Sequence, residues 1–206
     1  MFIHFSCATL VVPPCVSPCS ANIRLIRRFT GGGTVVVDKD TVFVTFVCNR
    51  EDVPSQPQYP RDVMRWSELF YKPVFDSLLR NPEHGFSLQD HDYCIGEQKV
   101  GGNAQSMTRN RWVHHTSFLW DYNPARMDVL SLPKKQPAYR EGRDHDSFLT
   151  TLSSHVQDTP NGVEDFFDAV EEQLRQGFAV EEAVWEHALA IANTYDGRRS
   201  NKYEEL

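Results

Sequence analysis

The 206 residues of this chain suffice for one domain with a sizeable core, and 40% apolar and 24% charged residues are typical of a globular protein. A formal net charge of -7 disfavours general nucleic-acid binding, and no apolar run reaches the roughly 18 residues of a membrane span. The five cysteines include no Cys-x-x-Cys pair, which disfavours a disulfide framework and favours an intracellular compartment.

The two ends of the chain differ from its middle. Residues 1–24 form a poorly informative segment that lacks both the basic start of a secretion signal and the arginines of a transit peptide. Residues 161–206 hold 11 acidic and 4 basic side chains, whereas residues 1–160 hold 17 of each. We therefore divide the chain into residues 1–24, a body over residues 25–158, and acidic C-terminal helices over residues 159–206.

The first half of the body is predicted to contain three strands and one helix. A turn over Asp38–Asp40 is expected just before the third strand. Apolar residues at helical spacing predict a helix over Arg61–Leu79. Pro60 suits the first turn of this helix, whereas Pro73 is expected to kink or split it. The strands are expected at residues 23–26, 34–37 and 41–48.

The second half begins with strands and ends with helices. A tight turn at Gly96–Glu97 is expected between two strands, and a basic, irregular loop over residues 134–143. The last ten residues are expected to fray. This order indicates an α/β or α+β domain with a mixed, largely antiparallel sheet flanked by helices. Strands are expected at residues 86–95, 98–104 and 112–122, and helices at residues 144–156, 161–176 and 180–193.

Three consecutive glycines follow two arginines in the segment RRFTGGGT, residues 27–34. Glycine allows a ligand to approach the backbone closely, at an entropic cost of about 1 kcal/mol per residue. Arginine guanidinium groups bind phosphate or carboxylate in a forked geometry. No Gly-Lys-Ser/Thr follows, so the segment is not a Walker A loop. A glycine-rich hairpin turn with arginines in solvent explains the motif as well.

Two further motifs place polar side chains on predicted strands. In EQKVGGNAQ, strand alternation is expected to put Lys99 and Gly101 on one face and Val100 on the other. The space beside such a lysine suits a phosphate or a developing oxyanion, although a surface lysine near a turn is an equal explanation. His114 and His115 are adjacent and should face opposite ways, one in the core and one lining a cleft, or both structural.

Together these motifs resemble those of the lipoate–protein ligase family, within the biotin/lipoate ligase superfamily. The family patterns are RRxSGGGxVxHD, [DR]xKxxGxA and HHG[ST]LL, and the counterparts here are RRFTGGG, EQKVGGNAQ and HHTSFLWD. The match covers about residues 25–148, with Val37 in place of the usual histidine and Thr116 in place of the usual glycine. The resemblance implies a catalytic domain of the biotin/lipoate ligase type over residues 25–158.

The resemblance also implies an activity, with ATP, lipoate and Mg²⁺ taking part. Such an enzyme forms lipoyl-AMP, or uses it ready-made, and attaches lipoate to a lysine of a lipoyl domain. Lys99 matches the invariant catalytic lysine, which stabilises developing charge and orients the mixed anhydride. Asp92 is a candidate contact to the metal or to adenosine. The implied nucleotide and lipoyl-AMP contacts are Arg28, Gly31, Gly32, Gly33, Thr34, Val35, Val36, Gly102, Asn103 and His115.

The implied partner is a lipoyl domain of a 2-oxoacid dehydrogenase complex or the glycine-cleavage H protein, in mitochondria or the cytoplasm. Only 26 residues precede Arg27, so we expect either a truncated N-terminus or an incomplete acyl pocket. The residues after 158 are too few for the accessory domain of some lipoate ligases. A separate activating subunit, or a supply of preformed lipoyl-AMP, is therefore expected.

Two alternatives remain open. A cysteine-dependent octanoyltransferase would need Cys94 or Cys48 as its nucleophile, although a structural role for Cys94 is also expected. A degenerate module could bind lipoyl-AMP or a lipoyl domain without turnover. The C-terminal helices have clear apolar faces, which favours their packing on the body over docking of a partner.

Overall fold

The computed structural model describes most of the body of the chain and short pieces outside it. For the strands at residues 2–7, 25–27 and 202–204, it describes the backbone alone. Among the residues described, no helix combines the length and the apolar content needed to cross a membrane. The described residues are 2–7, 25–27, 30, 34–127, 130, 136–157, 160–184, 186, 189–190 and 202–204.

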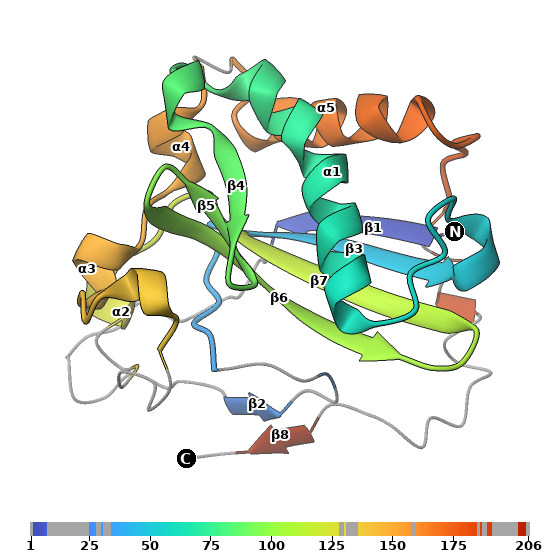
Figure 1. Ribbon diagram of the computed structural model, residues 1–206, viewed down its shortest axis with the longest axis horizontal. Coiled ribbons are helices and arrows are strands. Elements are labelled where there is room, and N and C mark those ends of the chain that lie inside the picture. The colour runs from blue at the N-terminus through green and yellow to red at the C-terminus, as the bar shows by residue number, and fades with distance from the viewer. Residues whose placement is uncertain are drawn as a thin grey trace.

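A six-stranded sheet with the order β1-β3-β7-β6-β5-β4 forms the centre of the molecule, and neighbouring strands are antiparallel throughout (Figure 1). A separate antiparallel pair joins β2 (Leu25–Arg27) to β8 (Lys202–Glu204). The strands of the large sheet are β1 (Phe2–Cys7), β3 (Thr41–Asn49), β4 (Phe86–Gln89), β5 (Asp92–Ile95), β6 (Gln98–Met107) and β7 (Arg111–Leu119).

Two long helices pack beside each other above this sheet (Figure 1). Helix α1 (Pro60–Leu78) begins at Pro60, as expected, and is not split at Pro73. Helix α5 (Val163–Arg175) confirms the expected helix in the acidic region. The remaining helices are short: η1 (Arg50–Asp52), η2 (Pro82–His84), α2 (Pro124–Met127), η3 (Ala138–Arg140), α3 (His145–Phe148) and α4 (Leu152–His155).

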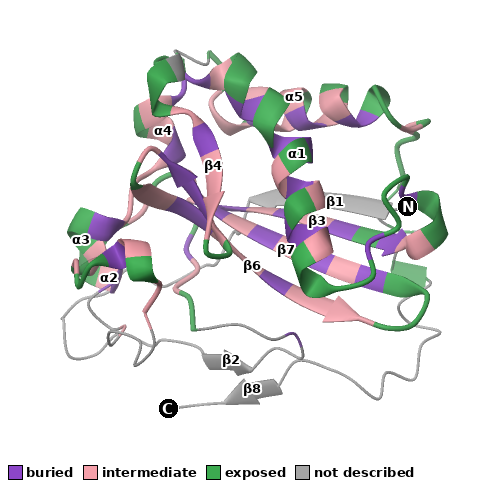
Figure 2. Ribbon diagram, viewed as in Figure 1, coloured by how far each residue is buried: buried purple, intermediate pink, exposed green. Residues whose placement is uncertain are grey.

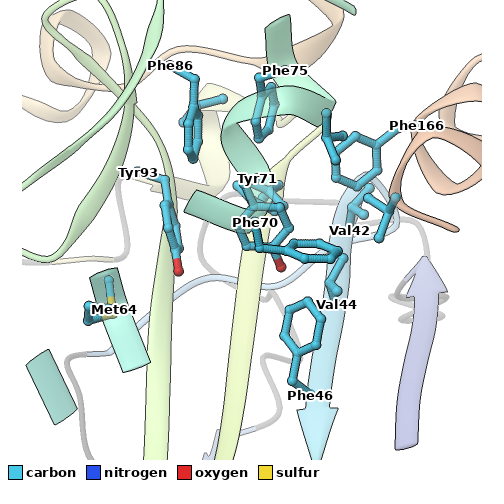
Figure 3. Packing of buried hydrophobic residues seen from close by; sticks show 14 of the residues in the cluster. Val42, Val44, Phe46, Met64, Phe70, Tyr71, Phe75, Phe86, Tyr93 and Phe166 are labelled. Atoms are coloured by element: carbon cyan, nitrogen blue, oxygen red, sulfur yellow. The ribbon is translucent and has the colours of Figure 1, made fainter. Parts of the chain in front are cut away.

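The core lies between the sheet and these two helices (Figures 2 and 3). Strand alternation explains the position of the core, because every second residue of β3 and of β7 points toward α1 and α5. Burying a large apolar side chain contributes roughly 1.5–3 kcal/mol, so this face dominates the stability of the fold. The fully or nearly fully buried members include Val42, Val44, Phe46, Tyr71, Phe75, Trp112, Phe118, Phe166 and Val170.

Several local predictions were wrong near the ends of elements. The expected strand over residues 86–95 is two strands, because Asp90 and His91 adopt φ values of 55° and 111° and turn the chain. Residues 34–37 belong to no strand, and residues 180–184 are not helical. The rest of the last expected helix lies largely outside the described residues. At the C-terminal end, residues 202–204 form a strand rather than a frayed segment, and within the N-terminal segment residues 2–7 form a strand.

The expected helix over residues 144–156 is interrupted. Leu149 forms an isolated parallel bridge with Lys99 of β6, and the Thr150 amide donates to the Lys99 carbonyl oxygen at 2.9 Å. A strand-like contact demands extended backbone, which ends α3 and delays the start of α4. The segment after the sheet is thereby pinned against the strand that carries Lys99.

Candidate functional site

The hairpin of β5 and β6 carries the candidate lysine. The expected turn at Gly96–Glu97 joins these strands, and Gly96 has a φ of 57°, which glycine adopts without strain. Tyr93 pairs with Gly101, but Cys94 pairs with Lys99, so β6 has one residue more than β5 between these pairs. Such a bulge resets the alternation of faces along the strand.

The bulge changes which glycine lies beside Lys99. A Cβ at Gly101 would lie 2.6 Å from Cδ1 of the buried Phe118, whereas a Cβ at Gly102 would lie 3.5 Å from Lys99 Nζ. The expected shared face of Lys99 and Gly101 was therefore wrong, because regular alternation does not hold across the extra residue. Gly102 provides the space beside the amine, and Gly101 admits Phe118 to the core.

The two neighbouring glycines should therefore respond differently to the same substitution. Gly101→Ala would force Cβ against Phe118 Cδ1 and, at 2.9 Å, the Ser117 carbonyl oxygen. We expect a loss of about 1–3 kcal/mol in the free energy of unfolding, measured by urea titration. Gly102→Ala is the matched control, since its Cβ makes only ordinary contacts with Lys99. Equal losses in the two variants would contradict this assignment.

The Lys99 amine contacts a carboxylate of the neighbouring strand. Nζ lies 2.7 Å from Asp92 Oδ1, and the two side chains are 26% and 19% exposed. The other carboxylate oxygen, Oδ2, accepts a hydrogen bond of 2.9 Å from the Tyr139 hydroxyl. Lys99 and Asp92 were both predicted site residues, and the structure brings them together. Tyr139 was missed, although an aromatic residue inside the basic loop YREGR was an available signal.

The segment that supplies Tyr139 is held against the hairpin. Arg143 donates to the carbonyl oxygens of Glu97 at 3.1 Å and of Tyr139 at 2.8 Å. The Arg140 guanidinium lies 4.4 Å from the ring centroid of Phe148, and its Nε donates to the Arg143 carbonyl oxygen. These contacts use the guanidinium groups of the loop for internal packing.

The remaining predicted contacts are distributed over both faces of the sheet. Gly102 pairs with Ser117, and His115 with Ala104, on the face away from α1. Asn103 pairs with Thr116, whose hydroxyl accepts a hydrogen bond from Tyr71 of α1, so Asn103 belongs to the other face. Its amide donates to the His91 carbonyl oxygen at 2.6 Å.

The two histidines point to opposite faces, as expected. His114 is fully buried, whereas His115 is half-buried and its Nδ1 lies 2.9 Å from Thr45 Oγ1. Thr34 and Val35 are exposed and Val36 is half-buried, in the run that leads to the turn at Asp38. Arg28, Gly31, Gly32 and Gly33 lie outside the described residues.

Comparison with known families identifies the chain. The model of the family described as "Lipoyl protein ligase A/B catalytic domain" matches residues 16–175 of this chain. The chain belongs to this family. Among curated relatives, an inactive lipoate–protein ligase 2 of Plasmodium falciparum is 34% identical over 68% of this chain and 44% of its own length. A lipoate–protein ligase 2 of Staphylococcus aureus is 28% identical over 59% of this chain and 33% of its own length.

The chain therefore spans less than half the length of these two relatives. Solved structures agree on the fold at low sequence identity. A lipoate-protein ligase A bound with ATP superposes with a TM-score of 0.58 at 18% identity, over 82% of this chain and 66% of that one. A bi-partite lipoate protein ligase of Thermoplasma acidophilum gives 0.60 at 18% identity, over 82% and 65%. The predicted catalytic-domain fold is thus confirmed.

Within this lipoyl protein ligase domain, Asp38 lies in the turn that follows the glycine-bearing segment in the sequence. Its carboxylate accepts from the Asp40 amide at 3.1 Å and from the Thr41 hydroxyl at 3.3 Å, which fixes the expected turn. Arg126 of α2 lies 3.6 Å away from the same carboxylate. This buried acid matches the aspartate of the family's first motif and connects it to α2.

Asp92 was the predicted contact for Mg²⁺. Among the described residues, no three histidine, cysteine or acidic side chains gather as a metal site. Asp92 contacts Lys99 and Tyr139 instead, and its contact to a metal stays a prediction. We therefore assign no chemical step to a metal held by the protein.

The two cysteines that could act as nucleophiles are poorly suited to that role. Cys94 is fully buried, and burial raises the pKa of its thiol. Burial likewise raises the pKa of Cys48 to about 12. A nucleophilic cysteine needs an accessible thiolate, so these surroundings disfavour the octanoyltransferase alternative.

Proposed function

We propose that this chain is the acyl-transfer domain of a lipoate–protein ligase or lipoyltransferase, which forms or uses lipoyl-AMP and lipoylates a lysine of a lipoyl domain. The observation that carries the proposal is the placement of Lys99 in a lipoyl protein ligase domain. Its amine lies beside Gly102 and is held by a carboxylate that an anionic ligand can replace. A charge so placed suits an acyl-phosphate.

The proposed chemistry proceeds in two steps. First, the lipoate carboxylate attacks the α-phosphorus of ATP, the bond to the leaving pyrophosphate breaks, and lipoyl-AMP forms. Second, the amine of the acceptor lysine attacks the acyl carbon, the bond from that carbon to the AMP oxygen breaks, and the amine loses a proton to solvent. Both steps build negative charge on oxygen, which a preorganised ammonium group stabilises.

Different residues of this chain would contact different parts of the acyl-adenylate. Lys99 would contact the acyl carbonyl and the phosphate, and Arg28 would contact the phosphate. Bare backbone of Gly31–Gly33 would admit the acyl-adenylate closely. Thr34, Val35, Val36, Gly102, Asn103 and His115 remain proposed contacts, of which Gly102 and His115 share a face of the sheet. Water must be kept from the mixed anhydride, because hydrolysis competes with transfer.

Two names among the similar proteins support the choice of substrates. One solved relative is described as bound with ATP, and another as a bi-partite ligase with its E2 lipoyl domain. We extend these to lipoyl domains of 2-oxoacid dehydrogenase complexes, or to the glycine-cleavage H protein, as acceptors. A separate activating subunit would supply lipoyl-AMP if this chain does not form it.

The intact mass of an apo lipoyl domain tests the proposal. One sample receives the full chain, lipoate, ATP and Mg²⁺, and a second receives the chain and preformed lipoyl-AMP. We expect a gain of one lipoyl group in the second sample. A gain in the first as well indicates a self-sufficient ligase. If neither sample gains mass beyond the protein-free control, catalysis by this chain is excluded.

A second candidate function is binding without turnover. It is favoured by the curated relative of Plasmodium falciparum, which is 34% identical and is named an inactive ligase. Titration calorimetry with lipoyl-AMP separates the two candidates. Tight binding without any mass gain on the acceptor would support a binding module, whereas binding with transfer supports the enzyme.

A further inference from the structure

The Asp92 carboxylate is shared between two donors of different kinds. Oδ1 lies 2.7 Å from the Lys99 ammonium, and Oδ2 accepts from the Tyr139 hydroxyl at 2.9 Å. An ammonium that must contact a ligand has to leave its carboxylate. A hydroxyl donor on the same carboxylate disperses the negative charge and lowers the competition of that carboxylate for the lysine.

The hydroxyl of Tyr139 is oriented toward Asp92 by its surroundings. The Cys94 thiol lies 3.5 Å from the Tyr139 oxygen and donates to it, so the tyrosine proton is directed to Asp92. Burial and the negative charge of Asp92 hold the pKa of Tyr139 well above its usual value. The hydroxyl thus keeps its proton and acts as a donor.

The ring and the backbone of Tyr139 are also held by residues outside the two strands that carry Asp92 and Lys99. Its ring lies 5.3 Å from that of Phe148, and Arg143 donates to its carbonyl oxygen. Because Thr150 donates to the Lys99 carbonyl oxygen, the same segment also holds the backbone beneath the lysine. A phenylalanine at position 139 would keep the ring packing and lose only the hydroxyl.

We propose that Tyr139 is a positioning residue that determines how firmly Asp92 holds Lys99. While Lys99 is paired, Tyr139 shares the carboxylate, and when Lys99 turns to an anion, Tyr139 keeps Asp92 hydrogen-bonded. For the identity of that anion, an acyl-phosphate, the inference rests on the proposed function. The claim about Lys99 itself needs no ligand and can be tested without one.

The first measurement is the reactivity of the Lys99 amine. The full chain is treated briefly with a limiting amount of acetic anhydride, and acetylation of Lys99 is read by peptide mass spectrometry relative to Lys72. Lys72 is an exposed lysine of α1 that pairs with Asp76 at 2.9 Å, so it serves as an internal reference. The variants are Tyr139→Phe, Asp92→Asn and both together. Tyr71→Phe is the control, since it removes a core hydroxyl that donates to Thr116.

Tyr139→Phe should lower the labelling of Lys99 about threefold, because the undivided carboxylate holds the amine more firmly. Asp92→Asn should raise it, and adding Tyr139→Phe to Asp92→Asn should change nothing further. Tyr71→Phe should leave it unchanged. Wild-type labelling in Tyr139→Phe would overturn the proposal. An equal decrease in the Asp92→Asn background would overturn it too, since Tyr139 would then act by another route.

The second measurement is the dissociation constant of lipoyl-AMP for the same proteins. We expect it to rise about threefold in Tyr139→Phe, in step with the decrease in labelling. If wild type does not bind lipoyl-AMP but the labelling follows the expected order, the proposed function fails and the role of Tyr139 stands. If wild type binds lipoyl-AMP but the labelling of Lys99 is the same in Tyr139→Phe, the role of Tyr139 fails and the proposed function stands.

Discussion

Lys99→Ala should reduce lipoyl transfer to an apo lipoyl domain by at least about 100-fold, the usual loss when a preorganised charge is removed from a developing oxyanion. The reduction should appear with preformed lipoyl-AMP as well as with lipoate and ATP, because both steps build charge on oxygen. The initial rate of mass gain by the acceptor domain is the measurement.

Stability should change little in Lys99→Ala. The Lys99–Asp92 pair is partly exposed, and such pairs contribute about 1 kcal/mol or less. Lys72→Ala is the matched control, since it removes another paired lysine far along the chain on α1. Normal transfer by Lys99→Ala would remove Lys99 from the mechanism. Failure of both variants would indicate a general defect instead.

Acidification should destabilise the fold through His114. This residue is fully buried, and burial lowers its pKa to about 3 from the usual 6.5. The unfolded chain therefore binds a proton below about pH 6.5 that the folded chain refuses until about pH 3. Stability from the neutral imidazole is complete above pH 6.5 and is lost progressively as the pH falls toward 3.

The hydrogen bonds around His114 explain why it resists protonation. Ser67 Oγ donates to the Met64 carbonyl oxygen and lies 2.6 Å from the Tyr93 hydroxyl, which lies 2.8 Å from His114 Nε2. Because the Ser67 proton is used on Met64, Tyr93 donates to Ser67, and His114 donates from Nε2 to the Tyr93 oxygen. No described residue partners Nδ1, so protonation there would create a buried N–H without an acceptor.

His114→Gln is the variant that tests this expectation, because glutamine does not titrate. Between about pH 7.5 and 4.5, wild type should lose about 2–3 kcal/mol more unfolding free energy than the variant. Urea titrations at several pH values measure the difference. His155, whose pKa is also lowered by burial, remains in both proteins and cancels. Parallel pH profiles of the two proteins would refute the role of His114.

Patterns confined to single elements were predictable from the sequence. Alternation in TVFVTFVC gave β3, and helical spacing with Pro60 at the start gave α1. The opposite orientation of His114 and His115 followed from the same strand geometry. The three motifs identified the family, because their residue types and order are local properties of the chain. Lys99 and Asp92 were predicted as site residues in the same way, and the structure brings them into contact.

Contacts between distant segments decided the rest. The bulge that places Gly102 rather than Gly101 beside Lys99 depends on how β5 pairs with β6. The break between α3 and α4 depends on the bridge from Leu149 to Lys99. Tyr139 reaches Asp92 across 47 positions of sequence. Sequence alone determined which residues carry charge and which strands and helices could form, whereas the tertiary structure decided which charges meet, because hydrogen-bond pairing and burial are set by neighbours in space.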